Sequence, residues 1–357
     1  MVRFGRRRLI ASVVMATLAL LSVATGGSAA AVDPPLPGDL PAAATRQLDV
    51  PQKVLLYGDS ITMGSAGHWT WRYRLWRGLQ AAGTSVDFVG PLHTLWTYKG
   101  GDTTSLEYRD PSFDTDHAAV AGTTLAHPQW TMAELAAEYH PDVIVGLLGF
   151  NDLRFGASPE HLIDLWRQQI ALTREADPGV AIILGQYGQT WFPYVPGYNA
   201  QLAELAGELN RPESPVLVAQ APSMRERPDT VDGAHLTTNG EILQAKSVAA
   251  ALAQVGLASA PAASDPPDDG SLAPVPAPSL SGQTVTISWT NVDFSTSEDV
   301  YVHDMTTGAW GIRPYFTGST IAFQGQLGHT YDVILAPVQG WAEVGTRSLP
   351  VSVKVPF

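Results

Sequence analysis

The sequence predicts an α/β unit built on a doubly wound parallel sheet of five strands, followed by a small all-β sandwich. Short apolar runs alternate with stretches of helical period through the first two thirds of the chain, whereas period-two alternation prevails near its end. Between these parts, residues 257–278 are rich in proline, alanine and aspartate. Such a segment cannot bury enough apolar area to hold one conformation, so we interpret it as a linker.

The first unit, residues 50–256, contains runs rich in valine, isoleucine and leucine that we expect to form strands: 54–57, 86–89, 143–148, 180–184 and 216–218. Stretches of helical period lie between and after them, at 71–82, 132–139, 159–175, 198–209 and 239–255. Apolar strands separated by helices indicate a parallel sheet that is covered on both faces. The alternation is typical of a flavodoxin-like doubly wound sheet.

The second unit, residues 279–357, has the pattern of a small sandwich, because Val285, Ile287 and Trp289 alternate with polar residues. Trp289, together with Leu327 and Tyr331 in the segment Leu-Gly-His-Thr-Tyr, resembles the core tryptophan and tyrosine corner of fibronectin type III domains. This resemblance implies a spacer or an accessory module.

Three further aromatic residues of this unit, Trp310, Tyr315 and Trp341, allow two interpretations. They could form a carbohydrate-binding face, or they could be buried in the core of the sandwich. The sequence does not decide between these alternatives.

The amino-terminal residues 1–31 have the pattern of a secretory signal peptide, with four arginines before the apolar residues 9–24 and small residues after them. Arg6 and Arg7 also leave a twin-arginine export route open. The apolar run is shorter than the ~20 residues that a transmembrane helix needs. We therefore expect a secreted, extracellular protein without stable membrane insertion, in which a proline-rich segment, 32–49, precedes the first unit.

Composition narrows the possible chemistry. Lys and Arg number 21 against 34 Asp and Glu, a formal charge of −13, which disfavours a nucleic-acid partner. The chain has no cysteine, so thiolate catalysis, disulfides and iron–sulfur clusters are excluded. Any reaction must use oxygen and nitrogen groups.

Ser60 lies directly after the first apolar run, where the chain turns toward a helix, and this edge of a parallel sheet is where ligands bind. A serine hydroxyl becomes a nucleophile when a base takes its proton, and imidazole is the usual base. His235 follows Asp232 by three residues after the last strand, so Asp232 could orient the ring toward Ser60. Taken alone, the same pair could equally be an aspartate turn and a histidine cap.

A serine nucleophile also needs donors for the negative charge that develops on the substrate oxygen. Gly122 offers a backbone N–H without a side chain, and Asn151 offers a side-chain amide after the run 143–148. The backbone N–H of Ser60 would be the third donor.

In this order, the blocks Gly-Asp-Ser-Ile-Thr, Gly122, Gly-Phe-Asn-Asp and Asp-Gly-Ala-His resemble the SGNH (GDSL-type) hydrolase superfamily. The resemblance implies ester hydrolysis through an acyl-serine, with Ser60 as nucleophile, His235 as general base and Asp232 as the orienting carboxylate. It also implies that the oxyanion hole consists of Ser60, Gly122 and Asn151, and that the fold is the flavodoxin-like sheet.

Residues 70–75 and 86–90 are most like carbohydrate esterase family 3, whose members deacetylate xylan. Residues 114–122 depart from that family's pattern by having alanine at three positions, which suggests a more apolar acyl pocket. We therefore expect a secreted serine esterase acting on short acyl esters, chiefly acetyl, of a polysaccharide. Two alternatives remain: a lipase or lysophospholipase, and an extracellular carbohydrate-binding or adhesion protein whose hydrolase unit is silent.

Trp191, Phe192 and Tyr194 follow the run 180–184 and could line the substrate site, although ordinary loop packing explains them equally well. Asp114, Asp116 and His117 do not form a pattern typical of a metal site. Because a serine triad needs neither metal nor cofactor, none is expected. The substrate would be an ester of an acylated carbohydrate, with no nucleic acid as partner.

Overall fold

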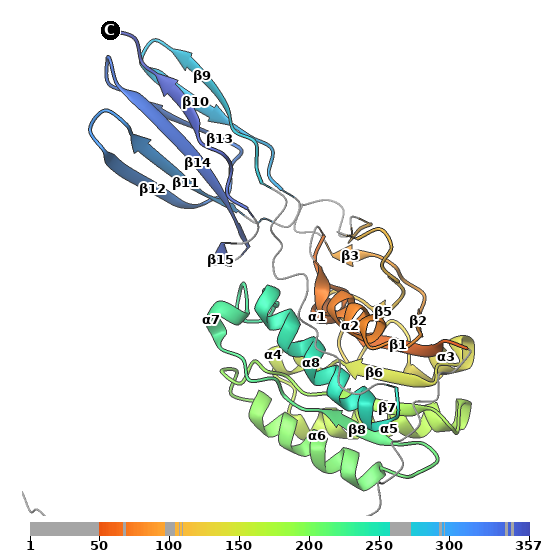
Figure 1. Cartoon of the computed structure of the whole chain (residues 1–357). Coiled ribbons are helices and arrows are strands. Elements are labelled where there is room, and N and C mark those ends of the chain that lie inside the picture. Colours follow the sequence, from red (N-terminus) through yellow and green to blue (C-terminus); the bar gives the residue numbers. More distant parts are fainter. Residues whose placement is uncertain are drawn as a thin grey trace, which may run out of the picture. The chain divides into compact units, whose positions relative to one another are not determined.

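The computed structural model describes residues 50–66, 69–96, 104–106, 108, 110–257, 273–292, 295, 297–339, 342–343 and 346–357. The expected signal peptide, the proline-rich segment 32–49, most of the expected linker and Trp341 lie outside these residues. Figure 1 shows the α/β part in red to green and the β part in blue. The two parts are described separately.

The α/β part is built on a sheet in the order β2-β1-β6-β7-β8, in which every neighbouring pair is parallel. These strands are β1 (Gln52–Gly58), β2 (Val86–Val89), β6 (Val143–Leu147), β7 (Ala181–Gly185) and β8 (Val216–Ala219). They coincide with the apolar runs of the sequence. Strands β6 and β7 and the last five residues of β1 are buried, whereas β2 and β8, at the two edges of the sheet, are only partly buried. The predicted doubly wound fold is confirmed.

Five long helices form where the sequence predicted them: α2 (Thr70–Ala81), α3 (Met132–Tyr139), α5 (Pro159–Ala176), α6 (Val195–Leu209) and α8 (Thr238–Gln254). Side-chain caps define several starts: the Thr131 hydroxyl accepts from the Glu134 N–H before α3, and the Ser158 hydroxyl accepts from the His161 N–H before α5. Helix α2 packs against α8, and α5 packs against α3 and α6 (Figure 1). Buried Arg74 of α2 pairs with Glu241 of α8 at 3.0 Å.

Several short elements were not predicted. Helix α1 (Ser60–Met63) follows β1, α4 (Phe150–Arg154) follows β6, and α7 (Glu226–Asp229) precedes α8. Strands β3 (Leu95–Trp96) and β4 (Thr104–Ser105) pair with each other, and β5 (Ala118–Ala119) pairs with the end of β1. These elements are too short to leave a periodic signal in the sequence.

The strand order places the functional edge of the sheet. The chain leaves β1 to form β2 on one side of it and later returns to form β6 on the other, so β1 and β6 flank the topological switch point. Ligands of open α/β sheets bind at the carboxyl ends of such strands. Ser60 follows β1 and Asn151 follows β6, so both lie at this edge.

The carboxyl-terminal part consists of two antiparallel sheets, as predicted for a sandwich. One has the order β13-β10-β9, with β9 (Ala277–Ser281), β10 (Thr284–Ser288) and β13 (Thr320–Gln324). The other has the order β12-β11-β14-β15, with β11 (Ser297–Asp304), β12 (Ala309–Phe316), β14 (Thr330–Gln339) and β15 (Ala342–Glu343), and β16 (Val351–Lys354) also pairs with β14.

Trp289 and Tyr331 both lie in the core of this sandwich with Val285, Ile287 and Val333. The Tyr331 hydroxyl accepts a hydrogen bond from the Gln326 backbone N–H at 2.9 Å, the geometry of a tyrosine corner.

Three other positions of the sandwich lie on its surface. Leu327 is exposed, as are Trp310 and Tyr315, so burial in the core does not account for these two aromatic side chains.

Candidate active site

The turn that carries Ser60 depends on two small features of the sequence. A Cβ at Gly58 would lie 2.3 Å from the Thr62 hydroxyl oxygen and 2.7 Å from the Leu147 carbonyl oxygen, so only glycine fits where β1 ends. Asp59 then caps α1, because its Oδ1 accepts the Ile61 N–H at 2.9 Å. Ser60 is therefore fixed as the first residue of a helix at the sheet edge.

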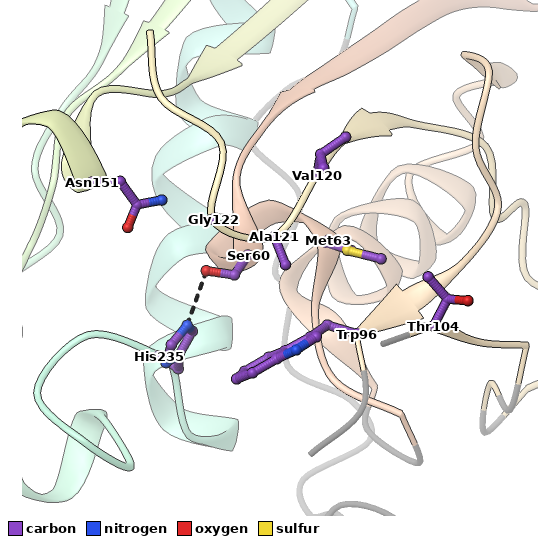
Figure 2. A pocket seen from close by; sticks show the side chains of 9 residues that line it. All are labelled: Ser60, Met63, Trp96, Thr104, Val120, Ala121, Gly122, Asn151 and His235. Carbon is purple, nitrogen blue, oxygen red and sulfur yellow. Dashed lines mark hydrogen bonds between the residues drawn. The ribbon is translucent and has the colours of Figure 1, made fainter. Parts of the chain in front are cut away.

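The structure brings Ser60, His235 and Asp232 together in a line. The Ser60 hydroxyl lies 2.9 Å from His235 Nε2, although the two residues are 175 positions apart in the chain (Figure 2). His235 Nδ1 lies 2.6 Å from Asp232 Oδ2. An imidazole held in this way can accept the serine proton on Nε2 while the carboxylate fixes the other ring nitrogen.

The loop that carries Asp232 and His235 is closed by its own carboxylate. Asp232 Oδ1 accepts the backbone N–H groups of Ala234 and His235 at 2.9 and 2.8 Å, and Gly233 adopts a φ of +87° that suits glycine. Partial burial alone would raise the pKa of Asp232, but hydrogen bonding and charge attraction from His235 outweigh it and lower this pKa to about 2. The carboxylate therefore stays ionised beside His235 at neutral pH.

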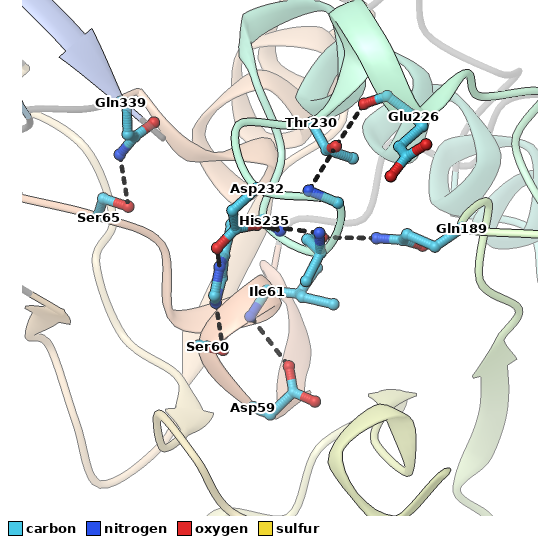
Figure 3. Close-up of polar contacts among 12 residues, drawn as sticks. Asp59, Ser60, Ile61, Ser65, Gln189, Glu226, Thr230, Asp232, His235 and Gln339 are labelled. Carbon is cyan, nitrogen blue, oxygen red and sulfur yellow. Dashed lines mark hydrogen bonds and ion pairs between the residues drawn. The ribbon is translucent and has the colours of Figure 1, made fainter. Parts of the chain in front are cut away.

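Two side chains after β7 hold the same loop from outside. Gln189 Nε2 donates to the Ala234 carbonyl oxygen at 2.8 Å (Figure 3), and Trp191 Nε1 donates to the Gly233 carbonyl oxygen at 3.0 Å. Trp191 thus supports the backbone of the catalytic loop. The sequence analysis did not single out Gln189, because a glutamine in a loop carries no distinct signal.

Asn151 and Gly122 lie on the other side of Ser60 (Figure 2). Gly122 adopts a φ of +79°, and Asn151 Nδ2 donates to the Thr123 carbonyl oxygen at 2.9 Å, which ties the amide to the glycine loop. The adjacent carboxylate of Asp152 accepts the N–H groups of Leu125 and Ala126 at 2.8 and 3.0 Å. Two of the three donors proposed for an oxyanion hole, Gly122 and Asn151, therefore belong to one hydrogen-bonded assembly.

A cavity of about 410 Å³ opens directly beside Ser60. Its wall combines apolar side chains with the polar groups described above, and its lining residues are Ser60, Met63, Trp96, Thr104, Val120, Ala121, Gly122, Asn151 and His235 (Figure 2). The alanine-rich segment thus contributes an apolar wall. Trp96 and Met63 were missed by sequence analysis, because neither lies directly after a predicted strand.

Comparison with known proteins identifies the α/β part. The sequence model of the GDSL-like Lipase/Acylhydrolase family matches residues 56–241, which is more than half of the chain and includes Ser60 and His235. The chain belongs to this family. It is a serine ester hydrolase of the GDSL (SGNH) type. No curated protein matches the acylhydrolase in full-sequence comparison.

Solved structures similar to this acylhydrolase include several esterases. An acetyl esterase mutant crystallised with acetate ion is 25% identical over 57% of this chain and 98% of its own, with a TM-score of 0.47. A carbohydrate esterase family 3 protein from Talaromyces cellulolyticus is 26% identical over 57% and 98%, also with 0.47. The family 3 carbohydrate esterase of Clostridium thermocellum is 22% identical over 59% and 100%, with 0.46.

Trp191, Phe192 and Tyr194, which could have lined the substrate site of the acylhydrolase, are not among the residues that line the cavity. Phe192 packs edge-on against Phe150, with ring centroids 5.2 Å apart. Tyr194 is half exposed at the start of α6. Phe192 therefore contributes to loop packing, Tyr194 does not line the cavity, and Trp191 anchors the Gly233 carbonyl as described.

One buried carboxylate of the acylhydrolase is not part of the Ser60–His235–Asp232 line. Burial raises the pKa of Asp59 to about 7, although the hydrogen bond from the Ile61 N–H opposes this. Asp59 Oδ2 has no hydrogen-bond partner among the described residues. Those residues also contain no group of three or more His, Asp or Glu that could hold a metal, and no helix among them is both long and apolar enough to cross a bilayer.

Proposed function

We propose that this acylhydrolase is a secreted esterase that removes short acyl groups, chiefly acetyl, from a carbohydrate through an acyl-serine intermediate. The observation that carries the proposal is the compact cavity beside Ser60, which has an apolar wall of Met63, Trp96, Val120 and Ala121. Apolar side chains of this kind suit the acyl part of an ester. The polar lining residues Thr104 and Asn151 suit the hydroxyl groups of a sugar.

The arrangement supports a two-step reaction. His235 Nε2 takes the Ser60 proton while Ser60 Oγ attacks the ester carbonyl carbon, and the carbonyl oxygen receives the displaced electron pair beside Gly122 and Asn151. When the intermediate collapses, the alcohol leaves with the proton from His235, and the acyl group stays on Ser60. Water then attacks the acyl carbon with the same base, which releases the acid and restores the serine hydroxyl.

The choice of a carbohydrate ester has support in the sequence. Residues 70–75 and 86–90 resemble carbohydrate esterase family 3, and they form part of α2 and β2 with the turn after it. The alanine substitutions in the segment before Gly122 leave a lipid ester as the second candidate, because Ala121 faces the cavity.

Product analysis on two substrate panels distinguishes these candidates. Purified wild type should release acetate from acetylated xylan, and its rate on p-nitrophenyl esters should be highest for the shortest acyl chains. Ser60→Ala should lose both activities, which assigns them to this site. A rate maximum at about eight or more acyl carbons, with release of fatty acid from lysophospholipid, would instead support the lipase alternative.

We also propose that the sandwich is a fibronectin type III-like accessory module that contacts the polysaccharide through Trp310. Trp310 is 59% exposed on β12, which is an edge strand of its sheet among the described residues. Its indole stacks on His303 of β11, with ring centroids 4.1 Å apart and planes inclined by 6°. Since His303 covers one indole face, the other remains available to a sugar ring.

Retention of the full chain on insoluble xylan tests this contact. Trp310→Ala should weaken retention without changing hydrolysis of p-nitrophenyl acetate, whereas Leu349→Ala, at another exposed apolar position, should change neither. Equal retention of Trp310→Ala and wild type would refute the contact. Retention without any esterase activity would favour the binding or adhesion alternative.

Secretion is tested by determining the amino-terminal residue of the protein that is recovered from the medium. Expression of the full chain with its own first 31 residues should yield active protein in the medium, cleaved close to residue 31. An uncleaved protein retained in the cell would contradict the proposal.

A further inference from the structure

We infer that Trp96 is a positioning residue that holds the imidazole of His235 in the orientation required for catalysis. The inference rests on the proposed function, because it assigns to Trp96 a part in the same serine esterase reaction. The centroids of the two rings lie 5.1 Å apart, with their planes inclined by 35°. Figure 2 shows the indole reaching toward His235 from the side of the cavity that Thr104 lines.

The hydrogen bonds of the His235 ring restrain one of its motions only weakly. Ser60 Oγ at Nε2 and Asp232 Oδ2 at Nδ1 are bound at the two ends of the ring, in the directions of its nitrogen atoms. Contacts at these two ends restrain the ring within its plane but resist tilting about the line between them only weakly. Trp96 contacts the ring in a tilted arrangement, outside the line of these two hydrogen bonds, and therefore opposes this tilt.

Burial of His235 and Asp232 is too incomplete to hold the imidazole ring in place of Trp96. The side chain of Asp232 is 39% exposed and that of His235 is 17% exposed, so solvent reaches the pair. Gln189 and Trp191 hold the carbonyl groups of Ala234 and Gly233, but they fix the loop backbone and not the imidazole plane. Trp96 instead contacts the imidazole ring itself, in a tilted arrangement.

The backbone of Trp96 is tied to the helix that carries the nucleophile. Its N–H donates to the Gly64 carbonyl oxygen at 2.9 Å, and its carbonyl oxygen accepts the Ala66 N–H at 2.7 Å. The Gly64 N–H in turn donates to the Ser60 carbonyl oxygen at 3.0 Å. Because Trp96 is bonded to both ends of this turn, the ring support moves with Ser60 and keeps the base aligned with the nucleophile.

The same contact lies beside the positive charge that arises on the base during the reaction. His235 becomes an imidazolium when it accepts the Ser60 proton. An aromatic ring whose centroid lies within ~6 Å of a cation attracts it through the negative charge of the ring face. Trp96 therefore contributes both orientation and electrostatic stabilisation at the step where they affect kcat.

Kinetics of Trp96→Ala and Trp96→Phe on p-nitrophenyl acetate test the inference. Trp96→Ala should lower kcat by roughly 10- to 100-fold with KM within a few-fold of wild type, because misplacement of a catalytic group costs about this much. Trp96→Phe keeps an aromatic face and should recover most of the rate. Thr104→Ala alters the same cavity wall opposite Trp96 in the β3–β4 pair, and should affect KM more than kcat.

A double-mutant cycle separates positioning from substrate contact. If Trp96 acts through His235, adding Trp96→Ala to His235→Ala should change the residual rate by less than about twofold. If Trp96 only lines the acyl pocket, its loss should lower the residual rate as much as it lowers that of wild type. Thermal melting of each variant shows whether the fold is retained.

The outcomes are distinct. An inactive wild type on every ester would refute the proposed function. An active wild type whose kcat is unchanged by Trp96→Ala, or whose Trp96 effect persists without His235, would overturn the positioning role. A folded Trp96→Phe as inactive as Trp96→Ala would also overturn it, since the aromatic face would not then be the feature that counts.

Discussion

The Asn151 side-chain amide donates to the Thr123 carbonyl oxygen at 2.9 Å, one residue after the glycine that borders the nucleophile. This bond uses one amide hydrogen and directs the side chain beside Gly122. The second amide hydrogen remains available to a substrate oxyanion. In the proposed reaction, loop geometry and oxyanion stabilisation therefore depend on the same side chain.

Asn151→Ala should lower kcat by about 10²- to 10³-fold, the usual cost of removing one oxyanion donor. KM for p-nitrophenyl acetate should change little, because the interaction is strongest in the transition state. Asn210→Ala is the control: Asn210 also uses its side chain to bond a backbone group, the Val216 N–H, but it does not line the cavity. Equal losses in both variants would mean that the effect of Asn151 is structural.

Gly122→Ala tests whether catalysis needs the Gly122 backbone N–H in the orientation that its positive φ gives it. A Cβ at Gly122 meets no atom within 4 Å, so the cost of alanine is the strain of its φ of +79°, roughly 1–2 kcal/mol. Relief of that strain should rotate the N–H away from the oxyanion and lower kcat by about tenfold.

Gly83→Ala is a matched control for this substitution. Gly83 has a φ of +73°, also meets no atom within 4 Å of a built Cβ, and lies after α2 away from the cavity lining. Both variants should lose similar stability in thermal melting, but only Gly122→Ala should lose activity. If the two retain wild-type kcat alike, the Gly122 N–H is not an oxyanion donor.

Asp232→Asn should lower kcat by about 10²- to 10⁴-fold, since an amide cannot hold the imidazole as a carboxylate does. Asp304→Asn is the comparison, because Asp304 of the sandwich also binds a histidine Nδ1, that of His329, at 2.9 Å. Esterase assays of both variants should show a loss for Asp232 alone. Similar losses of activity in both variants would mean that breaking either Asp–His hydrogen bond lowers activity through a general effect on the protein.

The lowered pKa of Asp232, about 2, also predicts an acid dependence of stability. Because the folded-state pKa lies below the unfolded value, the carboxylate stabilises the fold above the unfolded value, and this contribution disappears as pH falls toward about 2. The melting temperatures of wild type and Asp232→Asn should therefore approach each other as pH falls from about 5 toward about 2. Curves that remain parallel over this range would show that the ionised pair does not stabilise the loop.

The fold followed from the sequence because each long element carries its own signal. The apolar run at β6 is buried on both faces, and Ser158 with Pro159 marks the start of α5. Ser60 and Asn151 could be placed at one edge because both follow strands of a parallel sheet. Trp96 could not, since its strand of two residues exists only through pairing with Thr104 and a bridge to Ser65.

Asp59 Oδ2, which has no hydrogen-bond partner among the described residues, makes the stability of the fold depend on pH near neutrality. Burial raises the pKa of Asp59 from 3.8 to about 7, so between these values the folded state binds more protons than the unfolded state. Stability should therefore decrease as pH rises through this window, because ionisation of the buried carboxyl group becomes costly.

Asp59→Asn should remove that dependence. Asparagine keeps an oxygen that can accept the Ile61 N–H and carries no charge, so the cap of α1 is retained. Thermal melting of wild type and variant from about pH 5 to about pH 8 should show the variant gaining stability relative to wild type as pH rises. Asp164→Asn, on the exposed surface of α5, serves as the control and should run parallel to wild type. If Asp59→Asn also runs parallel, Asp59 is ionised in the folded protein throughout this range, and another group must neutralise it.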